Sequence, residues 1–123
     1  MTTSTEVEKL QKVFKIVPAD IWKTSCESGF FVGSPDDKRD GYIHLSCACQ
    51  LRETFNKNFR GQSGLLLVAF KKSSLAPQLR WETSRNGELF PHFYGLLPTR
   101  LAIAQRSLAL NADGLAELDE DCL

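Results

Sequence analysis

The sequence predicts one α+β domain with two main helices and a mostly antiparallel sheet. Three observations predict this class. The chain has 123 residues, a length that suits a single domain. Two segments in its first half space their apolar residues as helices do, and about five segments, most of them later, have strand patterns. This grouping favours α+β over the regular alternation of a doubly wound parallel sheet.

The first strand and the first helix are expected near the start of the domain. Residues 13–17 read VFKIV, a run of β-branched and aromatic side chains typical of a strand. Pro18 ends this run and suits the first turn of a helix, for which Gly29 is the expected C-terminal cap. An apolar stripe is expected along this helix, formed by Ile21, Trp22 and Cys26. The next segment, 31–41, is rich in Gly, Pro and Asp and is therefore expected to be a loop.

A second strand and a second helix are expected to follow. Residues 42–46 read YIHLS, and because side chains alternate along a strand, Ile43 and Leu45 face one side. The opposite, polar face carries Tyr42, His44 and Ser46. Apolar residues then recur at helical intervals, at Ala48, Leu51, Phe55 and Phe59. They indicate a helix that begins after Ser46, its expected N-cap, and ends at Gly61.

The remaining strands are expected in the second half of the chain. The run 64–70, GLLLVAF, is continuously apolar, which is typical of a central strand covered on both faces. The segment 89–95, LFPHFYG, contains Pro91 and is therefore expected to be an edge strand or a structured loop. Two further strands are expected at 79–84 and 100–110, with a turn at 85–87.

Three regions are expected along the chain: a flexible N-terminus at 1–11, one folded domain at 12–110, and an acidic flexible tail at 111–123. The tail contains five acidic residues and no basic one. No apolar run approaches the roughly 20 residues of a transmembrane helix, and the N-terminus lacks the apolar core of a signal peptide. The expected location is therefore the cytoplasm, with the nucleus accessible if the source is eukaryotic, and the four cysteines are expected to be reduced.

The charge balance restricts the kinds of partner. The chain has 15 basic and 15 acidic side chains, so its formal net charge is zero. Nucleic-acid binders usually carry a basic excess or stripe, and anionic membranes attract clustered basic residues. Neither nucleic acid nor a membrane is therefore an expected partner, whereas a small-molecule ligand is expected. The oligomeric state stays open.

His44 is the first candidate for chemistry, because it shares a polar strand face with Tyr42 and Ser46. An imidazole titrates near neutral pH, so it can orient a ribose hydroxyl or act as a general acid or base. The alternative is a structural histidine bonded to backbone, beside a serine that only caps the next helix. Ser46 lacks the glycine-flanked setting of a nucleophilic serine, so we assign it to ligand binding at most.

The second candidate segment is 80–95, RWETSRNGELFPHFYG. Arg85 offers a two-pronged contact for a phosphate or carboxylate. His92 and Tyr94 are candidates to stack on or hydrogen-bond a base, and Glu82 is a candidate acid that would stabilise a developing positive charge. The alternative is a surface hairpin whose aromatic side chains only pack into the core.

A zinc site is considered and is not expected. The potential ligands are His44, Cys47, Cys49 and His92. Their C-x-C spacing differs from the usual C-x-x-C, and the chain has no second cysteine pair. Cys47, at the start of the second helix, is a minor candidate for a nucleophilic thiolate, because a helix N-terminus favours the charged form.

Three runs of sequence resemble a family catalogued as domain of unknown function 952. They are FKIVPADIW, DGYIHLS and LRWETSRNGELFPHFYGLLP, within a resemblance that extends from about Val13 to Leu110. The pattern W-E-x-S-R-x-G-x-x-F-P-H-x-Y-G is the most specific part. The family often has Gly-Gly where Asn86 and Gly87 stand here, and threonine and glutamate in place of Cys47 and Cys49. These departures weaken any role for the two cysteines.

Family members of known structure look like the ADP-ribosylation fold, so the resemblance implies an ADP-ribosyltransferase-like architecture. That architecture is a split, curved, mostly antiparallel sheet with a cleft for NAD between its halves. In enzymes of that fold, a strand His or Arg holds the NAD ribose, a Ser, Thr or Tyr supports the pocket, and an acid often completes it. The resemblance implies the first role for His44 and makes Glu82 a candidate for the acid. A likeness of fold does not by itself establish an activity.

Three functions stay open, and whether the protein is an enzyme stays open with them. The first is binding of NAD or a related nucleotide, with or without ADP-ribosyltransferase-like transferase or hydrolase activity. Its expected ligand contacts are Tyr42, His44, Ser46, Arg85 and Tyr94. The second is a hydrolase or transferase for another metabolite, with His44 and His92 as acid and base. The third is a non-catalytic module that recognises a protein partner through an exposed segment, 90–94.

Overall fold

Residues 11–116 and 118 are described by a computed structural model of the protein, and their fold is α+β. The strands are β1 (Lys12–Pro18), β2 (Phe30–Phe31), β3 (Ile43–His44), β4 (Leu65–Lys71), β5 (Leu79–Thr83), β6 (Leu89–Phe93), β7 (Leu97–Pro98) and β8 (Ala102–Ser107). The helices are α2 (Ala19–Ser28), α3 (Pro35–Asp40), α4 (Leu51–Asn58) and α5 (Lys72–Leu75), with 3-10 turns at Ala48–Gln50, Arg85–Gly87 and Thr99–Leu101. All pairs among the described strands are antiparallel, as predicted.

The central sheet has the strand order β1-β4-β8. Its middle strand, β4, is the continuously apolar run, so the prediction of a central strand is confirmed. Successive side chains of β4 point to opposite faces, and each face packs into its own apolar cluster. One cluster contains Val68 and Phe70, and the other contains Leu65, Leu67 and Ala69.

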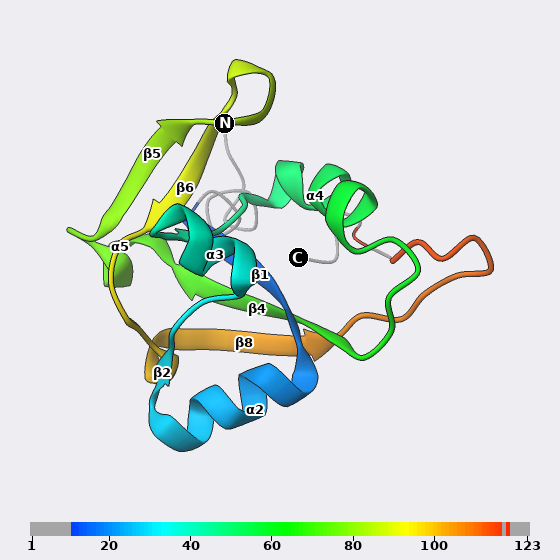
Figure 1. Ribbon diagram of the computed structural model, residues 1–123, viewed down its shortest axis with the longest axis horizontal. Coiled ribbons are helices and arrows are strands. Elements are labelled where there is room, and N and C mark those ends of the chain that lie inside the picture. Colours follow the sequence, from blue (N-terminus) through cyan, green and yellow to red (C-terminus); the bar gives the residue numbers. More distant parts are fainter. Residues whose placement is uncertain (1–10, 117, 119–123) are drawn as a thin grey trace, which may run out of the picture.

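Helices α2 and α4 lie on opposite sides of this sheet (Figure 1). Trp22 of α2 packs into the cluster on one face, and Phe55 of α4 packs into the cluster on the other. The stripe predicted for α4 is confirmed, because Leu51 and Phe55 belong to that second cluster and Ala48 and Phe59 pack against it. The stripe predicted for α2 is wrong in two places. Ile21 and Cys26 are exposed, and the buried residues of α2 are Trp22 and Ser25.

A second sheet has the order β3-β6-β5, with β6 in the middle. The prediction that Pro91 confines this segment to an edge or a loop is therefore wrong. Pro91 accepts a hydrogen bond from the backbone N–H of Leu45 at 3.0 Å, but it has no N–H to return one. The proline fits on a central strand because the two-residue strand β3 has already ended at this pair.

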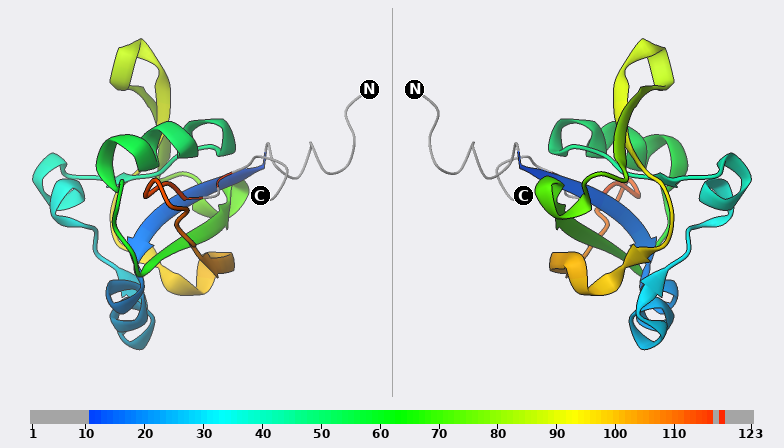
Figure 2. Two further views of the ribbon diagram at one scale, coloured as in Figure 1. Left: turned by 90° about the vertical axis from the view of Figure 1, so that its right-hand side faces the viewer. Right: turned by 90° about the vertical axis from the view of Figure 1, so that its left-hand side faces the viewer.

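The β5–β6 hairpin projects from the body of the molecule, as both side views show (Figure 2). At the base of this hairpin, an isolated bridge between Phe14 of β1 and Ser46 joins the second sheet to the first. The two residues exchange backbone hydrogen bonds of 2.8 and 2.9 Å. This bridge brings Lys15 of β1 next to His44 of β3, and the candidate site forms at that junction.

The segment 31–41, predicted as a loop, contains the helix α3, so that prediction is wrong. Ser34 and Asp37 form a reciprocal capping box, Pro35 occupies the first turn, and Gly41 ends the helix in the left-handed conformation (φ 86°). These are standard start and stop signals of a helix. They lie in a segment whose composition otherwise indicates a loop.

The segment after Asn111 differs from the predicted flexible tail in the part that the structure describes. The Asn111 side chain accepts hydrogen bonds from the backbone N–H groups of Asp113 and Leu115, which closes a turn. Leu118 is buried in the same cluster as Phe55. Most of the predicted flexible N-terminus, 1–11, and the acidic residues 119–121 lie outside the described residues. Among the described residues, no helix combines the length and apolar character needed to span a membrane.

Candidate functional site

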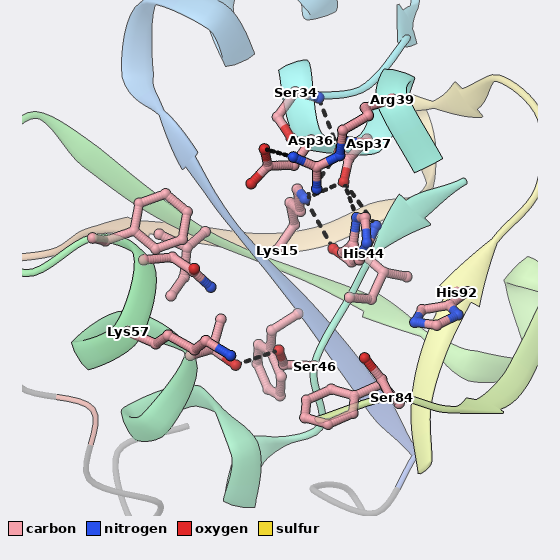
Figure 3. A pocket seen from close by; sticks show the side chains of 17 residues that line it. Lys15, Ser34, Asp36, Asp37, Arg39, His44, Ser46, Lys57, Ser84 and His92 are labelled. Atoms are coloured by element: carbon pink, nitrogen blue, oxygen red, sulfur yellow. Dashed lines mark hydrogen bonds and ion pairs between the residues drawn. The ribbon is translucent and has the colours of Figure 1, made fainter. Parts of the chain in front are cut away.

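A cleft of about 330 Å³ opens where α3, α4 and the two sheets meet (Figure 3). Helix α3 contributes Asp36, Asp37 and Arg39, and α4 contributes Thr54, Lys57 and Asn58. Strand β1 contributes Phe14, Lys15 and Ile16. His44 and His92 line the same cleft from β3 and β6, where they are direct strand partners with ring centroids 5.5 Å apart. The cleft therefore combines charged groups, two imidazoles and apolar surface, as ligand sites commonly do.

The Asp37 carboxylate is the centre of a buried ionic cluster on one side of the cleft. Its two oxygens lie 3.1 and 3.0 Å from Lys15 Nζ, and Oδ1 lies 2.6 Å from His44 Nδ1. The backbone N–H of His44 donates to Oδ1 and that of Ser34 donates to Oδ2. Lys15 also donates to the His44 carbonyl at 2.9 Å. These contacts tie α3, β1 and β3 together.

The charges in this cluster explain the two pKa shifts found there. Burial alone would raise the pKa of the Asp37 carboxyl, but the hydrogen bond from His44 and the charge of Lys15 outweigh it and hold the pKa far below its usual value. Burial lowers the pKa of Lys15, and the charge of Asp37 opposes that shift. Asp37 is therefore ionised throughout the neutral range and acts as a fixed negative charge.

Gly33 makes room for this carboxylate. A Cβ atom at position 33 would lie only 2.8 Å from the Asp37 Cβ, and the glycine has φ of 109°, where other residues are strained. The close approach lets the Ser34 backbone N–H reach Asp37 Oδ2 at 2.9 Å. A glycine is thus required at the entrance to α3.

Both ring nitrogens of His44 lie against carboxylates. Nδ1 contacts Asp37, and Nε2 lies 3.0 Å from Asp40 Oδ2. A carboxylate can only accept, so a neutral imidazole satisfies one of these contacts and an imidazolium satisfies both. Asp40 is held in turn by Arg39, which also contacts Asp36 (Figure 3). His44 therefore has a carboxylate partner at each ring nitrogen.

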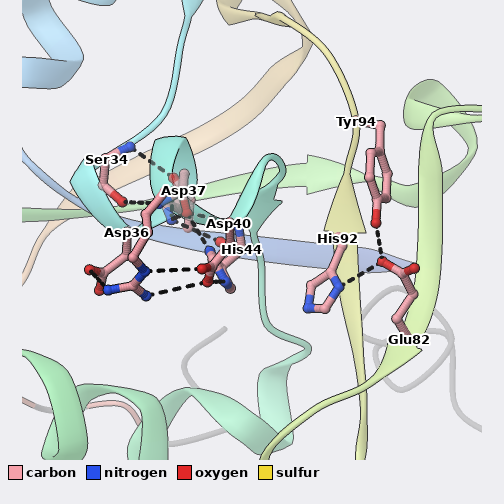
Figure 4. Close-up of polar contacts among 10 residues, drawn as sticks. Ser34, Asp36, Asp37, Asp40, His44, Glu82, His92 and Tyr94 are labelled. Atoms are coloured by element: carbon pink, nitrogen blue, oxygen red, sulfur yellow. Dashed lines mark hydrogen bonds and ion pairs between the residues drawn. The ribbon is translucent and has the colours of Figure 1, made fainter.

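His92 has a different environment. Its Nδ1 lies 2.9 Å from Glu82 Oε1, and the Tyr94 hydroxyl donates to the same oxygen at 2.7 Å. Because Glu82 can only accept, Nδ1 carries the proton of a neutral ring and Nε2 is left as an acceptor. The residue is only 2% exposed, but Nε2 is not a buried atom without a partner, so this nitrogen keeps some access at the cleft. This nitrogen lies on the side of the ring away from Glu82 (Figure 4).

Tyr42 covers the two histidines. Its ring stacks on His92 with centroids 4.1 Å apart and an interplanar angle of 20°, and it lies 4.8 Å from the His44 ring. Burial, followed by the nearby carboxylates of Asp40 and Glu82, raises the pKa of the Tyr42 phenol. Tyr42 therefore restricts the orientation of the His92 ring and remains a neutral phenol near neutral pH.

The structure brings six of the seven predicted site residues into one neighbourhood, but only three of them line the cleft. Those three are His44, Ser46 and His92. Tyr42, Glu82 and Tyr94 lie behind or over the histidines and contact them or each other. The side chain of Arg85 lies outside the described residues, and its backbone forms the predicted turn.

Ser46 does not cap the second helix, so that prediction is wrong by one position. The helical segment starts after Cys47, whose backbone N–H donates to the Gln50 side chain at 3.0 Å. The Ser46 hydroxyl instead lies 3.2 Å from the Thr54 hydroxyl at the cleft wall. Ser46 is thus a cleft residue whose hydroxyl already has a partner.

The environment of Cys47 is unfavourable for a thiolate. Burial and the neighbouring Cys49, with its sulfur 4.0 Å away, raise the pKa of Cys47 to about 11. The suggestion of a nucleophilic Cys47 is therefore not supported, because only the thiolate is reactive. Among the described residues, no group of three or more His, Cys, Asp or Glu side chains is arranged to hold a metal ion.

The aromatic segment 90–94 is mostly buried. Phe90 and Phe93 are 6% and 4% exposed, and Phe93 packs into the core with Trp22 and Phe70. A protein-recognition surface formed by this segment would require those rings at the surface. The third function considered from the sequence therefore loses the feature on which it depended.

Sequence reasoning missed the charged side chains around His44. These are Lys15, Asp37 and Arg39, which line the cleft, and Asp40, which contacts His44 beside it. Asp37 had a detectable signal, because the sequence Ser-Pro-Asp-Asp is a helix start with a capping box. Lys15 also had one, since it is the single charged residue in the otherwise apolar run 13–17. Arg39 and Asp40 had no signal, because their roles depend on where α3 docks.

The fold and the site define a small α+β domain with a histidine-lined cleft between its sheets. The chain belongs to the family described as "Protein of unknown function (DUF952)", which matches residues 16–105. It is similar to the X-ray crystal structure of protein CC0527 from Caulobacter crescentus, with 40% identity and a TM-score of 0.84 over 87% of this chain and 94% of that one. The solution NMR structure of CC0527 shows 40% identity and a TM-score of 0.82 over 92% and 97%. No curated protein matches the chain.

Proposed function

We propose that this protein binds a phosphorylated small molecule in the cleft, with NAD or a related nucleotide as the chemical class. One observation carries the proposal: two histidines from segments far apart in the sequence are direct strand partners and line one cleft. Structural histidines would be satisfied by the protein alone, whereas Nε2 of His92 is left as an acceptor at the cleft.

The roles of the side chains follow from their contacts. His92 Nε2 accepts a hydrogen bond from a ligand hydroxyl, such as one on a ribose. Lys57 and Arg39 line the cleft from opposite helices and attract a phosphate (Figure 3). The ADP-ribosyltransferase-like architecture implied by the family resemblance belongs to this proposal. In it, Glu82 orients His92 and does not touch the ligand, because Glu82 does not line the cleft.

Titration with NAD and with ADP-ribose, followed by ¹H–¹⁵N NMR, tests the proposal. We expect signals of residues 34–46 and 84–92 to shift together, and His92→Ala to weaken binding about tenfold or more through loss of the Nε2 acceptor. Ile103→Ala serves as a control, since Ile103 is 52% exposed on β8 and does not line the cleft. The proposal fails if neither ligand binds at millimolar concentration, or if His92→Ala binds as tightly as the wild type.

A second candidate function is acid–base catalysis on another small metabolite, by a hydrolase or transferase. The observation that favours it is that each imidazole is oriented by a carboxylate, which is how catalytic histidines are commonly held. In this mechanism, Nε2 of His92 accepts a proton and His44, as the imidazolium, donates one.

A thermal-shift screen of metabolites separates the two functions, because any ligand that binds only the folded state raises the apparent stability. Stabilisation by non-phosphorylated metabolites, with no response to NAD or ADP-ribose, would favour the second function over the first.

A further inference from the structure

The Asp40 carboxylate lies between the Arg39 guanidinium and the His44 imidazole at the edge of the cleft. Arg39 Nε and Nη2 contact its two oxygens at 3.0 and 3.3 Å, the two-pronged arrangement that arginine makes with carboxylates and phosphates. His44 Nε2 contacts the same carboxylate at 3.0 Å. Both Arg39 and His44 line the cleft. A protein carboxylate thus occupies a position that is suited to an acidic group of a ligand.

This contact differs from the other carboxylate contact of His44. The Asp37 side chain is 1% exposed, whereas the Asp40 and Arg39 side chains are 31% and 67% exposed. Exposed ion pairs contribute little to stability, so the Asp40 contact can be broken at small cost. The Asp37 contact would remain and keep His44 in place.

We propose that Arg39 and Nε2 of His44 form an oxyanion subsite, which Asp40 occupies until a ligand replaces it. The subsite takes a phosphate or carboxylate group in place of Asp40. Arg39 donates to this group, and His44, as the imidazolium, donates to it from Nε2 while Nδ1 donates to Asp37. Asp36 contacts Arg39 Nη1 at 3.2 Å and keeps the guanidinium oriented during the exchange. The inference rests on the proposed function, because it names the ligand group that the same cleft recognises.

A ligand can bind only those molecules in which Asp40 has moved away from the two donors. Its apparent affinity is therefore lower than its intrinsic affinity, in proportion to the fraction of such molecules. Removing Asp40 should therefore tighten anion binding, although the ligand contacts are unchanged. The chain offers a matched control in Asp36, which is also an exposed acid on α3 that contacts Arg39 but has no contact with His44.

The experiment titrates the wild type, Asp40→Ala and Asp36→Ala with inorganic pyrophosphate and, separately, with acetate. NMR follows the Arg39 side chain and the His44 ring. We expect Asp40→Ala to bind one of the anions about two- to fivefold tighter than the wild type, and Asp36→Ala to bind it no more tightly. The anion that shows the effect distinguishes a phosphate from a carboxylate ligand. Thermal unfolding checks that each variant is folded.

Equal tightening in both variants would show an effect of net charge alone and would overturn the inference, as would titrations that leave the His44 ring unshifted. Arg39→Lys keeps the positive charge but loses the two-pronged guanidinium contact, so it should weaken anion binding. Unchanged binding would count against the subsite. If wild type binds NAD but Asp40→Ala binds neither anion more tightly, the subsite fails and the proposed function stands. If no nucleotide binds but Asp40→Ala binds an anion at His44, the proposed function fails and the subsite stands.

Discussion

His44 and His92 lie side by side at one end of the cleft, yet their surroundings differ in burial and in the number of carboxylates. His44 has a carboxylate at each ring nitrogen, and one of them, Asp37, is 2% exposed. His92 has a carboxylate at Nδ1 only, and the side chain of that residue, Glu82, is 38% exposed. The difference shows that the His44 side belongs to a buried ionic cluster, whereas the His92 side leaves one ring nitrogen without a carboxylate.

The strongest test of this comparison removes the carboxylate at the centre of the buried cluster. Asp37→Ala leaves Lys15 as an uncompensated buried charge and removes the capping box of α3. Breaking a buried ion pair from one side costs about 3–5 kcal/mol, so we expect a loss of that size in the free energy of unfolding. Urea denaturation measures it.

Glu82→Ala provides the matched change on the other side, because it also removes a carboxylate that contacts a histidine. Since Glu82 is partly exposed, its loss should lower the free energy of unfolding far less than the loss of Asp37. Similar losses in the two variants would contradict the contrast between the two sides.

The next largest effect is expected on the free energy of unfolding as the pH is lowered. The pKa of Asp37 is lowered in the folded protein, so the unfolded chain binds its proton at higher pH than the native state does. The stabilisation is complete above the unfolded pKa of about 4 and is lost as pH falls from there toward the folded-state pKa. We expect the free energy of unfolding to decrease in this window.

Asp37→Asn should flatten the decrease, because an amide does not titrate. The measurement is urea denaturation of both proteins between neutral pH and the acid range. An equally steep acid slope in Asp37→Asn would mean that other carboxylates are responsible.

These two sides were not equally predictable from the sequence. The alternation of YIHLS placed His44 opposite Ile43 and Leu45, and both of those residues are buried as expected. Strand alternation is a local property, so one sequence is enough to predict it. The register that pairs His44 with His92 depends on how two distant segments pack, and only the structure supplies it.

The ionic cluster was missed for a related reason. Asp37 lies in a segment whose Gly, Pro and Asp content outweighed the shorter helix signal of its capping box. Its importance comes from Lys15 and His44, which are 22 and 7 residues away in the chain. Pro91 shows the opposite case. The rule that proline is confined to edge strands is valid in general, but it does not apply here, because β3 ends before the N–H that Pro91 lacks would be needed.

A smaller effect is expected on which nitrogen of the His92 ring carries the proton. The Glu82 carboxylate can only accept, so it fixes the neutral His92 ring with hydrogen on Nδ1. Glutamine can donate as well as accept, so Glu82→Gln should raise the population of the other tautomer, with hydrogen on Nε2. Long-range ¹H–¹⁵N NMR of the ring measures the two populations. Tyr94→Phe leaves the carboxylate in place and should keep the wild-type tautomer, whereas a change of equal size in this control would refute the role of Glu82.

The smallest expected effect is on the ionisation of a phenol. The hydrogen bond to Glu82 is the main cause that raises the pKa of Tyr94, whereas burial is the main cause for Tyr42. Glu82→Gln should therefore move the pKa of Tyr94 down toward the ordinary value of about 10 and affect Tyr42 less. The chain has two tyrosines, so phenolate absorbance in a Tyr42→Phe background reports Tyr94 alone. An unchanged midpoint would mean that the carboxylate does not hold the phenol proton.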